Sequence, residues 1–408
     1  MTGLLRVWLN ETPIGTITLL PSGNVFFAFD EEYLNTTDRL IISQSFFRPS
    51  GELIPESQAS AGKLPPFFSN LLPEGHMRKY LAQRGGVKPS HEFKLLELLG
   101  QDLPGAVIIT AMEGMPVDLT HTEEEKLKEG KDTQPLQFSL AGVQLKFSAI
   151  TERRGGLSIP ARGTGGDWIV KLPAQNYAHV PENEYAIMDM ASRIGIPVPD
   201  IKLVPLSDIG NLPAMGVLAG KQALAVKRFD RLPGGRRIHI EDFAQVYNVM
   251  PEKKYEGVSY AGMANMIWTL TGEAGLKDFI RRLTFTILTG NGDMHLKNWS
   301  FIYEDGKTPV LAPAYDLLST IPYIPDDGLA LKLPDTKDMR VIGIEHFKKL
   351  VKKAQIPEYL VLQTVRDTVD STFTAWAENN KHYDLPEEIR TGIQKHMEAT
   401  QLKNSHKK

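Results

Sequence analysis

The chain has 408 residues, 42% of them hydrophobic and 23% charged, which is typical of a soluble globular protein of two or three domains. Its 46 basic and 49 acidic side chains give a net charge of −3, which excludes a strongly basic protein that coats nucleic acid. It has no cysteine, which excludes disulfides, iron–sulfur clusters, cysteine-ligated zinc and a cysteine nucleophile. The sequence has neither a long apolar run nor a signal-peptide pattern at its start, so we expect a cytoplasmic protein.

The first third of the chain is predicted to be rich in β-strands. Apolar and polar side chains alternate over 4–9, and a second strand is predicted over 14–20 after a turn. Helices are predicted over 65–84 and 91–99. Gly100 is expected to end the second of these helices in the left-handed conformation that glycine adopts without strain.

A charged stretch suggests how the chain divides. Residues 121–133 contain almost no apolar side chain, which is typical of an exposed linker or a short surface helix. We therefore predict an N-terminal domain over 1–120, a middle domain over 134–235 and a C-terminal domain over 236–408.

The middle domain is predicted to combine short strands with one helix. The strands are expected at 168–172 and 223–227. Between them, one apolar helical face ends at Gly195, and it consists of Ile187, Met190, Ala191 and Ile194.

The C-terminal domain is predicted to be mostly helical. An apolar stripe marks one helix, and it consists of Leu276, Phe279, Ile280, Leu283 and Ile287. Further helices are predicted over 258–271, 345–354, 357–377 and 386–403. One β-hairpin is expected, because the apolar runs 299–303 and 309–312 flank an Asp-Gly turn.

The polar segment 290–299 carries the first sign of chemistry. It follows the striped helix, and its Asp293 and Asn298 lie five positions apart. This is the spacing of the protein-kinase catalytic loop, in which the aspartate accepts the proton of the acceptor hydroxyl and the asparagine binds magnesium. The spacing alone is weak, because short polar residues gather in loops for turn chemistry.

The predicted hairpin strengthens this interpretation. A chain that leaves Asn298 along one strand and returns along the next brings Asp316 back beside it. A carboxylate and a carboxamide at this place form a hard-oxygen site suited to Mg²⁺. Asp316 then takes the place of the aspartate in the kinase Asp-Phe-Gly motif, although its neighbours here are Tyr315 and Leu317.

Lys171 is predicted to point to the apolar side of its strand, where an ammonium group needs a partner. Glu184 lies near the start of the following helix, one turn before Ile187, on the face expected to pack inward. Lys171 and Glu184 match the ion pair of protein kinases between a lysine on a strand and a glutamate on the next helix. In kinases this lysine also binds the ATP phosphates. Glu182 is a rival partner, and a snorkelling lysine with an exposed glutamate is the plainer alternative.

The segment 137–148 has one glycine, Gly142, and matches neither of the common phosphate-binding glycine motifs. By itself it predicts a plain hairpin with a tight turn, to which Lys146 adds a positive charge.

Together these segments resemble the HipA family, the kinase toxins of bacterial HipBA-type toxin–antitoxin modules. The resemblance runs along nearly the whole chain. It is carried by the segments 67–73, 99–106, 138–146, 168–173, 182–185, 226–231, 241–245, 292–298 and 315–316. It implies an α+β, two-lobed, protein-kinase-like fold with an extra N-terminal β-rich subdomain and a mostly helical C-terminal lobe.

The resemblance also implies a role for individual residues. Asp293 would be the general base, Asn298 and Asp316 would bind Mg²⁺, Lys171 would pair with Glu184, and Ser139 would be the site of regulatory autophosphorylation. Contacts to ATP are implied for Ala141, Gly142, Val143, Gln144, Leu145, Lys146, Lys171, Lys227, Arg228, Phe229, His295, Lys297, Asn298, Tyr315 and Asp316. The chain departs from the family at Met294, where glycine is common.

The implied function is an ATP- and Mg²⁺-dependent serine/threonine protein kinase that acts as the toxin of a type II module. Its target would be a translation component such as an aminoacyl-tRNA synthetase. Its partner would be a HipB-like helix-turn-helix antitoxin dimer, through which it would reach operator DNA. A basic stripe at Lys348, Lys349, Lys352 and Lys353 could touch operator phosphates, but a solvated helix face explains it as well. Two alternatives remain: a small-molecule kinase on the same fold, and a catalytically silent antitoxin-binding corepressor.

Overall fold

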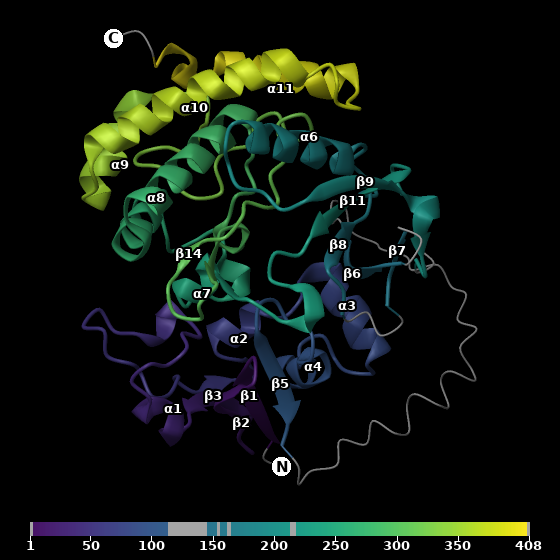
Figure 1. Ribbon diagram of the computed structural model, residues 1–408, viewed down its shortest axis with the longest axis vertical. Coiled ribbons are helices and arrows are strands. Elements are labelled where there is room, and N and C mark those ends of the chain that lie inside the picture. Colours follow the sequence, from purple (N-terminus) through teal and green to yellow (C-terminus); the bar gives the residue numbers. More distant parts are fainter. Residues whose placement is uncertain (1–2, 113–144, 153–155, 161–164, 213–217, 406–408) are drawn as a thin grey trace.

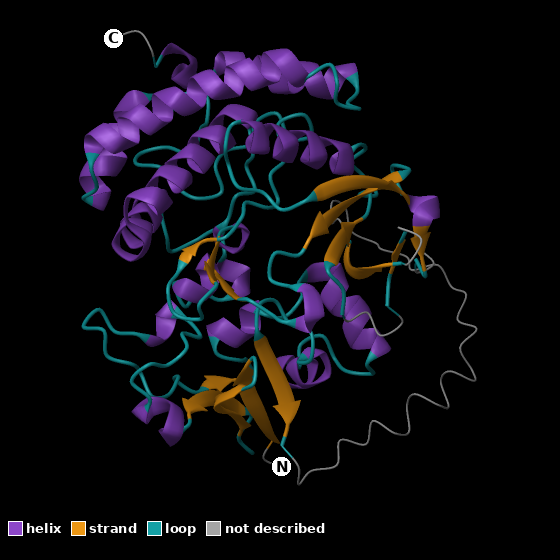
Figure 2. Cartoon of the chain, viewed as in Figure 1, coloured by secondary structure: helices purple, strands orange, loops and turns teal. Residues whose placement is uncertain are grey.

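The computed structural model describes residues 3–112, 145–152, 156–160, 165–212 and 218–405. The predicted linker 121–133, Ser139 and the loop positions from Ala141 to Gln144 lie outside these residues. Helices and strands both contribute substantially to the described chain, as Figure 2 shows, so the α+β fold class is confirmed.

The N-terminal part, residues 3–112, is built on an antiparallel five-stranded sheet (Figure 1). The predicted alternation holds in its first strand, where Leu5, Val7 and Leu9 are buried on one face. In spatial order the strands are β4 (Ser60–Ala61), β3 (Asn24–Phe29), β2 (Thr12–Leu19), β1 (Gly3–Leu9) and β5 (Val107–Ala111).

Short helices accompany this sheet, and two predictions about them need correction. The helix expected over 65–84 is two helices, because Pro73 lies in the turn between them and proline cannot continue a helix. Gly100 has a right-handed φ of −57°, and it must be glycine because a Cβ there would lie 2.5 Å from the carbonyl oxygen of Ile109. The helices are α1 (Glu31–Asn35), α2 (Pro66–Asn70), α3 (Gly75–Arg84) and α4 (Glu92–Leu99), with the 3₁₀ turn η1 (Gln44–Phe46).

The middle part contains a six-stranded sheet and one long helix. As predicted, the helix α6 (Val180–Arg193) is followed by Gly195 in the left-handed conformation, with a φ of 78°. In spatial order the strands are β10 (Ile209–Gly210), β7 (Leu157–Ser158), β6 (Lys146–Thr151), β8 (Trp168–Lys171), β11 (Gln222–Lys227) and β9 (Ile201–Pro205). Strand β8 lies inside the sheet because it pairs with β6 on one side and with β11 on the other. Both pairings are antiparallel.

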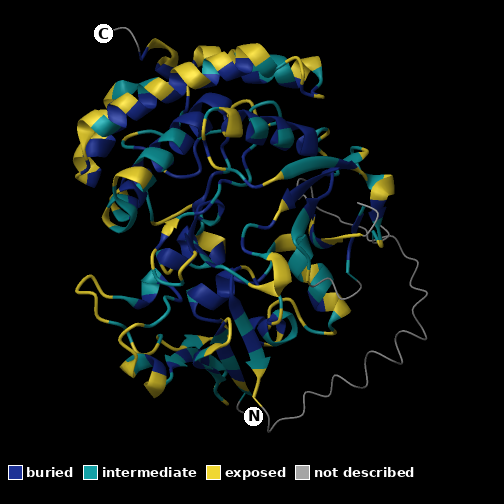
Figure 3. Cartoon of the chain, viewed as in Figure 1, coloured by how far each residue is buried: buried dark blue, intermediate teal, exposed yellow. Residues whose placement is uncertain are grey.

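The C-terminal part is mostly helical. Its longest helix, α8 (Tyr260–Thr289), joins the predicted helix over 258–271 to the apolar stripe that follows it, with one non-helical residue at Gly272. All five stripe residues are fully buried. The helices α9 (Ile344–Ala354), α10 (Glu358–Asn379) and α11 (Glu387–Ala399) complete this layer, and Figure 3 shows exposed residues along all three.

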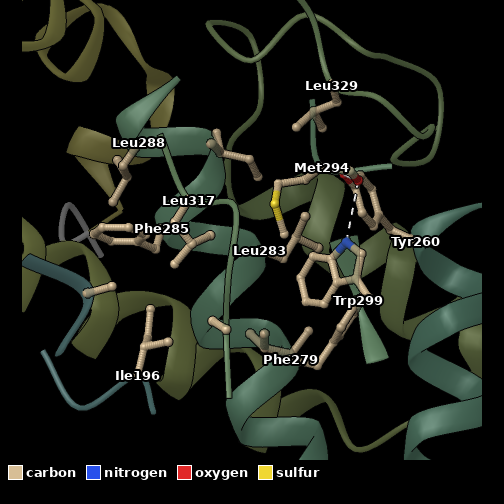
Figure 4. Close-up of a cluster of buried hydrophobic side chains, with 14 of the residues drawn as sticks. Ile196, Tyr260, Phe279, Leu283, Phe285, Leu288, Met294, Trp299, Leu317 and Leu329 are labelled. Carbon is tan, nitrogen blue, oxygen red and sulfur yellow. Dashed lines mark hydrogen bonds between the residues drawn. The ribbon is translucent and has the colours of Figure 1, made fainter. Parts of the chain in front are cut away.

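The predicted hairpin is present and carries the site. Strands β13 (Ser300–Tyr303) and β14 (Val310–Leu311) are antiparallel, and β12 (His239–Asp242) pairs with the other side of β13. The short helix α7 (Phe243–Val246) follows β12. One hydrophobic core is shared by α6, α8 and the later helices, and it includes Phe301 and Tyr303 of β13. Figure 4 shows the part of this core around Phe279, Met294 and Trp299.

Buried polar contacts join the N-terminal part to the rest of the chain. The Glu241 carboxylate accepts hydrogen bonds from the Ser43 hydroxyl at 2.6 Å and from the Gln44 amide at 3.0 Å. The His239 ring bonds the carbonyl of Ile42 at 2.7 Å. A second junction is a network of buried ion pairs, and it consists of Asp102, Arg228, Asp230 and Arg231.

Candidate active site

Lys171 lies at the centre of a buried charge cluster. It ends β8, only 3% of it is exposed, and its ammonium group contacts the carboxylates of both Glu184 and Asp316. Glu184 comes from the first turns of α6 and is 1% exposed. The rival Glu182 is buried elsewhere, with the His179 ring 4.0 Å from its carboxylate. The structure therefore brings Lys171 together with Glu184.

The charges of this cluster stabilise one another. Burial acts to lower the pKa of Lys171, but the Asp316 and Glu184 carboxylates outweigh it and raise the pKa to about 12. Burial likewise acts to raise the pKa of Asp316, but Lys146 and Lys171 hold it well below its usual range. Burial raises the pKa of Glu184. Near neutral pH, Lys171 is therefore charged and faces an ionised Asp316.

Asp316 itself has an uncommon backbone conformation. Its φ of 54° lies in the left-handed region, where a residue with a Cβ is disfavoured. The surrounding contacts hold it there: Lys146 bonds one carboxylate oxygen at 2.7 Å, Lys171 contacts the other, and the Asn291 amide donates to its carbonyl at 3.2 Å. Residues kept in such conformations are concentrated at functional sites.

Side-chain hydrogen bonds shape the loop after α8. Gly290 ends the helix with a φ of 70°. The Asn291 side chain accepts from the Asp293 amide at 3.0 Å, the Thr320 hydroxyl accepts from the Gly292 amide at 2.9 Å, and the Asn298 amide donates to the Asp293 carbonyl at 2.9 Å. Asp293 and Asn298, predicted from spacing alone, are thus joined directly.

Met294, the departure from the family pattern, has a packing role. It is 1% exposed, and its side chain belongs to the large C-terminal core (Figure 4). Its carbonyl accepts from the Tyr260 hydroxyl at 3.1 Å and from the Trp299 indole at 3.3 Å. A larger residue is tolerated here because its side chain enters the core.

The carboxylate of Asp293 is mostly buried, and burial raises its pKa. It accepts a 2.6 Å hydrogen bond from the hydroxyl of Tyr255. Tyr255 stands 38 residues earlier in the chain, and no motif in the sequence points to it. Its only sequence signal is an aromatic residue among polar neighbours.

Two predicted ATP-site residues have other contacts. Lys297 points toward the N-terminal part, where it donates to the Asn70 carbonyl and lies 2.9 Å from the Glu74 carboxylate. His295 is buried, and burial lowers its pKa to about 3, so it is neutral. Its Nδ1 has no hydrogen-bond partner among the described residues. Of these two residues, only His295 has a side-chain polar atom that lacks a partner among the described residues.

Lys227, Arg228 and Phe229, for which the resemblance implies contacts to ATP, have side chains in three different places. The Arg228 side chain points away from the charge cluster and pairs with Asp230 at 2.9 Å and with Asp102 at 3.3 Å. The Phe229 ring lies 5.9 Å from the ring of Tyr315, next to Asp316. The Lys227 ammonium lies 3.3 Å from Asp200, on an exposed surface.

The remaining predicted positions are placed as follows. Leu145 is buried, and its carbonyl accepts from the Leu172 amide at 2.9 Å. The Tyr315 hydroxyl lies 2.5 Å from the Ser300 hydroxyl and donates to the Lys297 carbonyl at 3.0 Å. On α9, Lys348 and Lys349 pair with acidic neighbours within 3 Å, which supports a solvated face there.

The side chains of Asp316 and Asn298 carry the kind of oxygen donors that Mg²⁺ prefers. Asp316 supplies an ionised carboxylate, and the hydrogen bond from the Asn298 NH₂ group leaves its amide oxygen available as a ligand. Mg²⁺ takes one or two protein oxygens and completes its shell with water and phosphate. Among the described residues, no three histidine, cysteine, aspartate or glutamate side chains form a group that could hold a metal ion.

Comparison with protein families decides the assignment. A family model described as the HipA N-terminal domain matches residues 5–110, and one described as the HipA-like C-terminal domain matches residues 138–376, more than half of the chain. The chain belongs to the HipA family. The resemblance inferred from the motifs is therefore confirmed.

Individual relatives match most or nearly all of the chain. A Sinorhizobium fredii protein, named provisionally as a kinase, is 48% identical over 98% of this chain and 97% of its own length. The serine/threonine-protein kinase toxin HipA of Shewanella oneidensis is 27% identical over 79% of this chain and 78% of its own. Its close relatives and its family thus place the chain among HipA-type kinases.

A solved structure has the same fold. Shewanella oneidensis HipA, in a complex with HipB and operator DNA, matches 98% of this chain and 96% of its own with a TM-score of 0.73 and 22% identity. The two-lobed, HipA-like architecture is thereby confirmed. In the part of the chain that the structure describes, no helix has the length and apolar character needed to cross a membrane.

Proposed function

We propose that this HipA-family chain is an ATP- and Mg²⁺-dependent serine/threonine protein kinase and the toxin of a type II toxin–antitoxin module. One observation carries the proposal: Lys171 contacts both Glu184 and Asp316, while Asp293 and Asn298 are hydrogen-bonded in the adjacent loop. This combination supplies a phosphate-binding cation, a base and hard-oxygen ligands at one place.

Each residue has a distinct task in this proposal. Lys171 and Lys146 bind the ATP phosphates. The segment 227–229 binds adenine through peptide groups other than the Lys227 and Arg228 amides, which donate to the carbonyls of Asp200 and Asp167. Asn298 and Asp316 would hold Mg²⁺, which neutralises charge on the phosphates when bound. Asp293 accepts the proton of the acceptor hydroxyl, whose oxygen attacks the γ-phosphorus, while the bond from that phosphorus to the β-phosphate oxygen breaks and ADP leaves.

The remainder of the proposal concerns targets and partners. The complex of Shewanella HipA with HipB and operator DNA supports a HipB-like antitoxin dimer as partner, with DNA reached mainly through it. A translation component such as an aminoacyl-tRNA synthetase is the proposed target. Regulatory autophosphorylation is proposed at Ser139, where nearly two added negative charges would oppose ATP binding.

The proposal can be tested by measuring the intact mass of the purified chain before and after incubation with Mg-ATP. We expect about 80 Da of added mass, the mass of one phosphoryl group, mapped to Ser139. Asp293→Ala should bind ATP and gain nothing, whereas Asp38→Ala, a control at an exposed aspartate, should behave as wild type. A chain that binds Mg-ATP but transfers no phosphate to itself, to casein or to small hydroxyl compounds is instead a silent corepressor.

A further inference from the structure

Tyr255 occupies the place that the proposed mechanism requires for the acceptor hydroxyl. Its hydroxyl donates to the Asp293 carboxylate at 2.6 Å. A general base must come within about 2.6–3.2 Å of the hydroxyl whose proton it accepts. Burial and the nearby Asp293 charge both raise the pKa of Tyr255, so the phenol keeps its proton and remains the donor.

The backbone next to Tyr255 is held firmly. The carbonyl of Lys254 accepts a 3.2 Å hydrogen bond from the Leu296 amide, inside the catalytic loop. The Lys254 ammonium lies 2.8 Å from the carboxylate of Glu74, which also contacts Lys297. The position of residue 255 relative to Asp293 is therefore fixed by contacts to both the loop and the N-terminal part.

The side chain of Tyr255 is much less confined than its backbone. The residue is 43% exposed, and its ring meets the His295 ring edge to face at 5.0 Å. A rotation about its side-chain bonds would carry this partly exposed ring toward solvent and uncover Asp293.

We propose that Tyr255 is an internal acceptor mimic, whose hydroxyl covers the base Asp293 until an acceptor hydroxyl displaces it. This inference rests on the proposed kinase function and adds to it a residue that controls access on the acceptor side. It predicts that Tyr255 competes with acceptors, water included, and does not compete with ATP.

The test is Tyr255→Phe, which keeps the ring against His295 and removes only the hydroxyl. The matched control is Tyr359→Phe, because Tyr359 is 82% exposed on α10. Two activities are measured with Mg-ATP: hydrolysis, with water as the acceptor, and phosphorylation of casein as a generic serine/threonine acceptor. Melting temperatures confirm that each variant is folded.

We expect Tyr255→Phe to raise hydrolysis roughly three- to tenfold and to lower the KM for casein by a similar factor, because one hydrogen bond to a charged group is removed. The kcat for casein and the KM for ATP should stay unchanged, and Tyr359→Phe should match wild type.

Other results would overturn the inference in distinguishable ways. A fall in kcat at constant KM shows that Tyr255 orients the base. Phosphate found on Tyr255 by peptide mapping shows that it is an acceptor. Unchanged kinetics show that it does not compete. If wild type and both variants bind Mg-ATP but transfer and hydrolyse nothing, the kinase function itself fails, and this inference fails with it.

Discussion

Glu74, from the N-terminal part, lies 2.9 Å from the ammonium group of Lys297 in the catalytic loop. It also binds Lys254, which precedes Tyr255. Burial acts to raise the pKa of Glu74, but Lys297 and Lys254 outweigh it and lower the pKa to about 2. The N-terminal part therefore contacts the proposed catalytic machinery directly.

Replacing this carboxylate should loosen the loop. We expect Glu74→Gln to lower the free energy of unfolding by about 1 kcal/mol, a modest value because the carboxylate is partly exposed. Transfer of phosphate should slow severalfold with ATP affinity unchanged. Urea unfolding and casein phosphorylation check this, with Glu304→Gln at an exposed hairpin position as control. A loss of ATP affinity as large as the loss of transfer rate would contradict the assignment of Lys297 to a contact with the N-terminal part.

Removing the central lysine should affect stability and nucleotide binding separately. Lys171→Met leaves the buried Glu184 without its cation, so we expect a loss of about 3–5 kcal/mol in stability and at least about tenfold weaker ATP binding. Adding Glu184→Leu removes the unpaired charge and should restore much of the stability without restoring ATP affinity. Calorimetric titration with ATP and chemical unfolding distinguish the two effects. Recovery of ATP binding in the double variant would show that Lys171 does not contact the phosphates.

The metal site predicts a magnesium-dependent phenotype. Wild type should bind ATP more tightly with Mg²⁺ than with excess EDTA. In Asp316→Asn the ionised ligand is lost, so this difference should shrink by about tenfold or more. Binding measured by titration in both conditions provides the check. If Asp316→Asn keeps the full difference in ATP affinity between Mg²⁺ and EDTA, the metal ion is bound by other residues.

The junction at Glu241 should make stability depend on pH. Burial raises its pKa from 4.5 to about 7, so the folded chain keeps a proton that the unfolded chain releases between these values. Its contribution to stability is therefore present below pH 4.5 and is lost as the pH rises toward 7, at a slope of at most about 1.4 kcal/mol per pH unit.

Glu241→Gln cannot titrate and isolates this contribution. We expect the difference in unfolding free energy between wild type and variant to change steadily between pH 4.5 and 7 and to be flat outside that range. His239 and Asp242 are present in both proteins, so the difference isolates Glu241 together with its repulsion from Asp242. A constant difference from pH 4 to 8 would mean that Glu241 has an ordinary pKa.

Much of the fold follows from local patterns in the sequence. The alternation in β1, the stripe of α8, the hairpin after Asn298 and the left-handed Gly195 all depend on neighbours within a few residues, and all are present. The prediction for Gly100 is wrong because its constraint is the carbonyl of Ile109 on strand β5, which no local pattern reveals.

The site could be predicted only in part for the same reason. Asp293, Asn298 and Asp316 have fixed spacing around one hairpin, so the sequence indicates them together. Tyr255 and Glu74 reach the same loop from other segments, and their positions depend on how the N-terminal part packs against the C-terminal part. The motif predicts a contact between Lys297 and ATP, and it gives no sign that the Lys297 ammonium also lies 2.9 Å from the Glu74 carboxylate.

The ion pairs of Asp102 with Arg228 and Arg231 have a consequence for how the protein can be divided. In an isolated fragment that starts at residue 134, the two arginines and the nearby Glu241 would lose their partners from residues 42–105. Such a fragment should be insoluble or poorly folded. Supplying residues 1–120 as a separate chain should rescue it, because the junction is held by noncovalent contacts across a complementary surface.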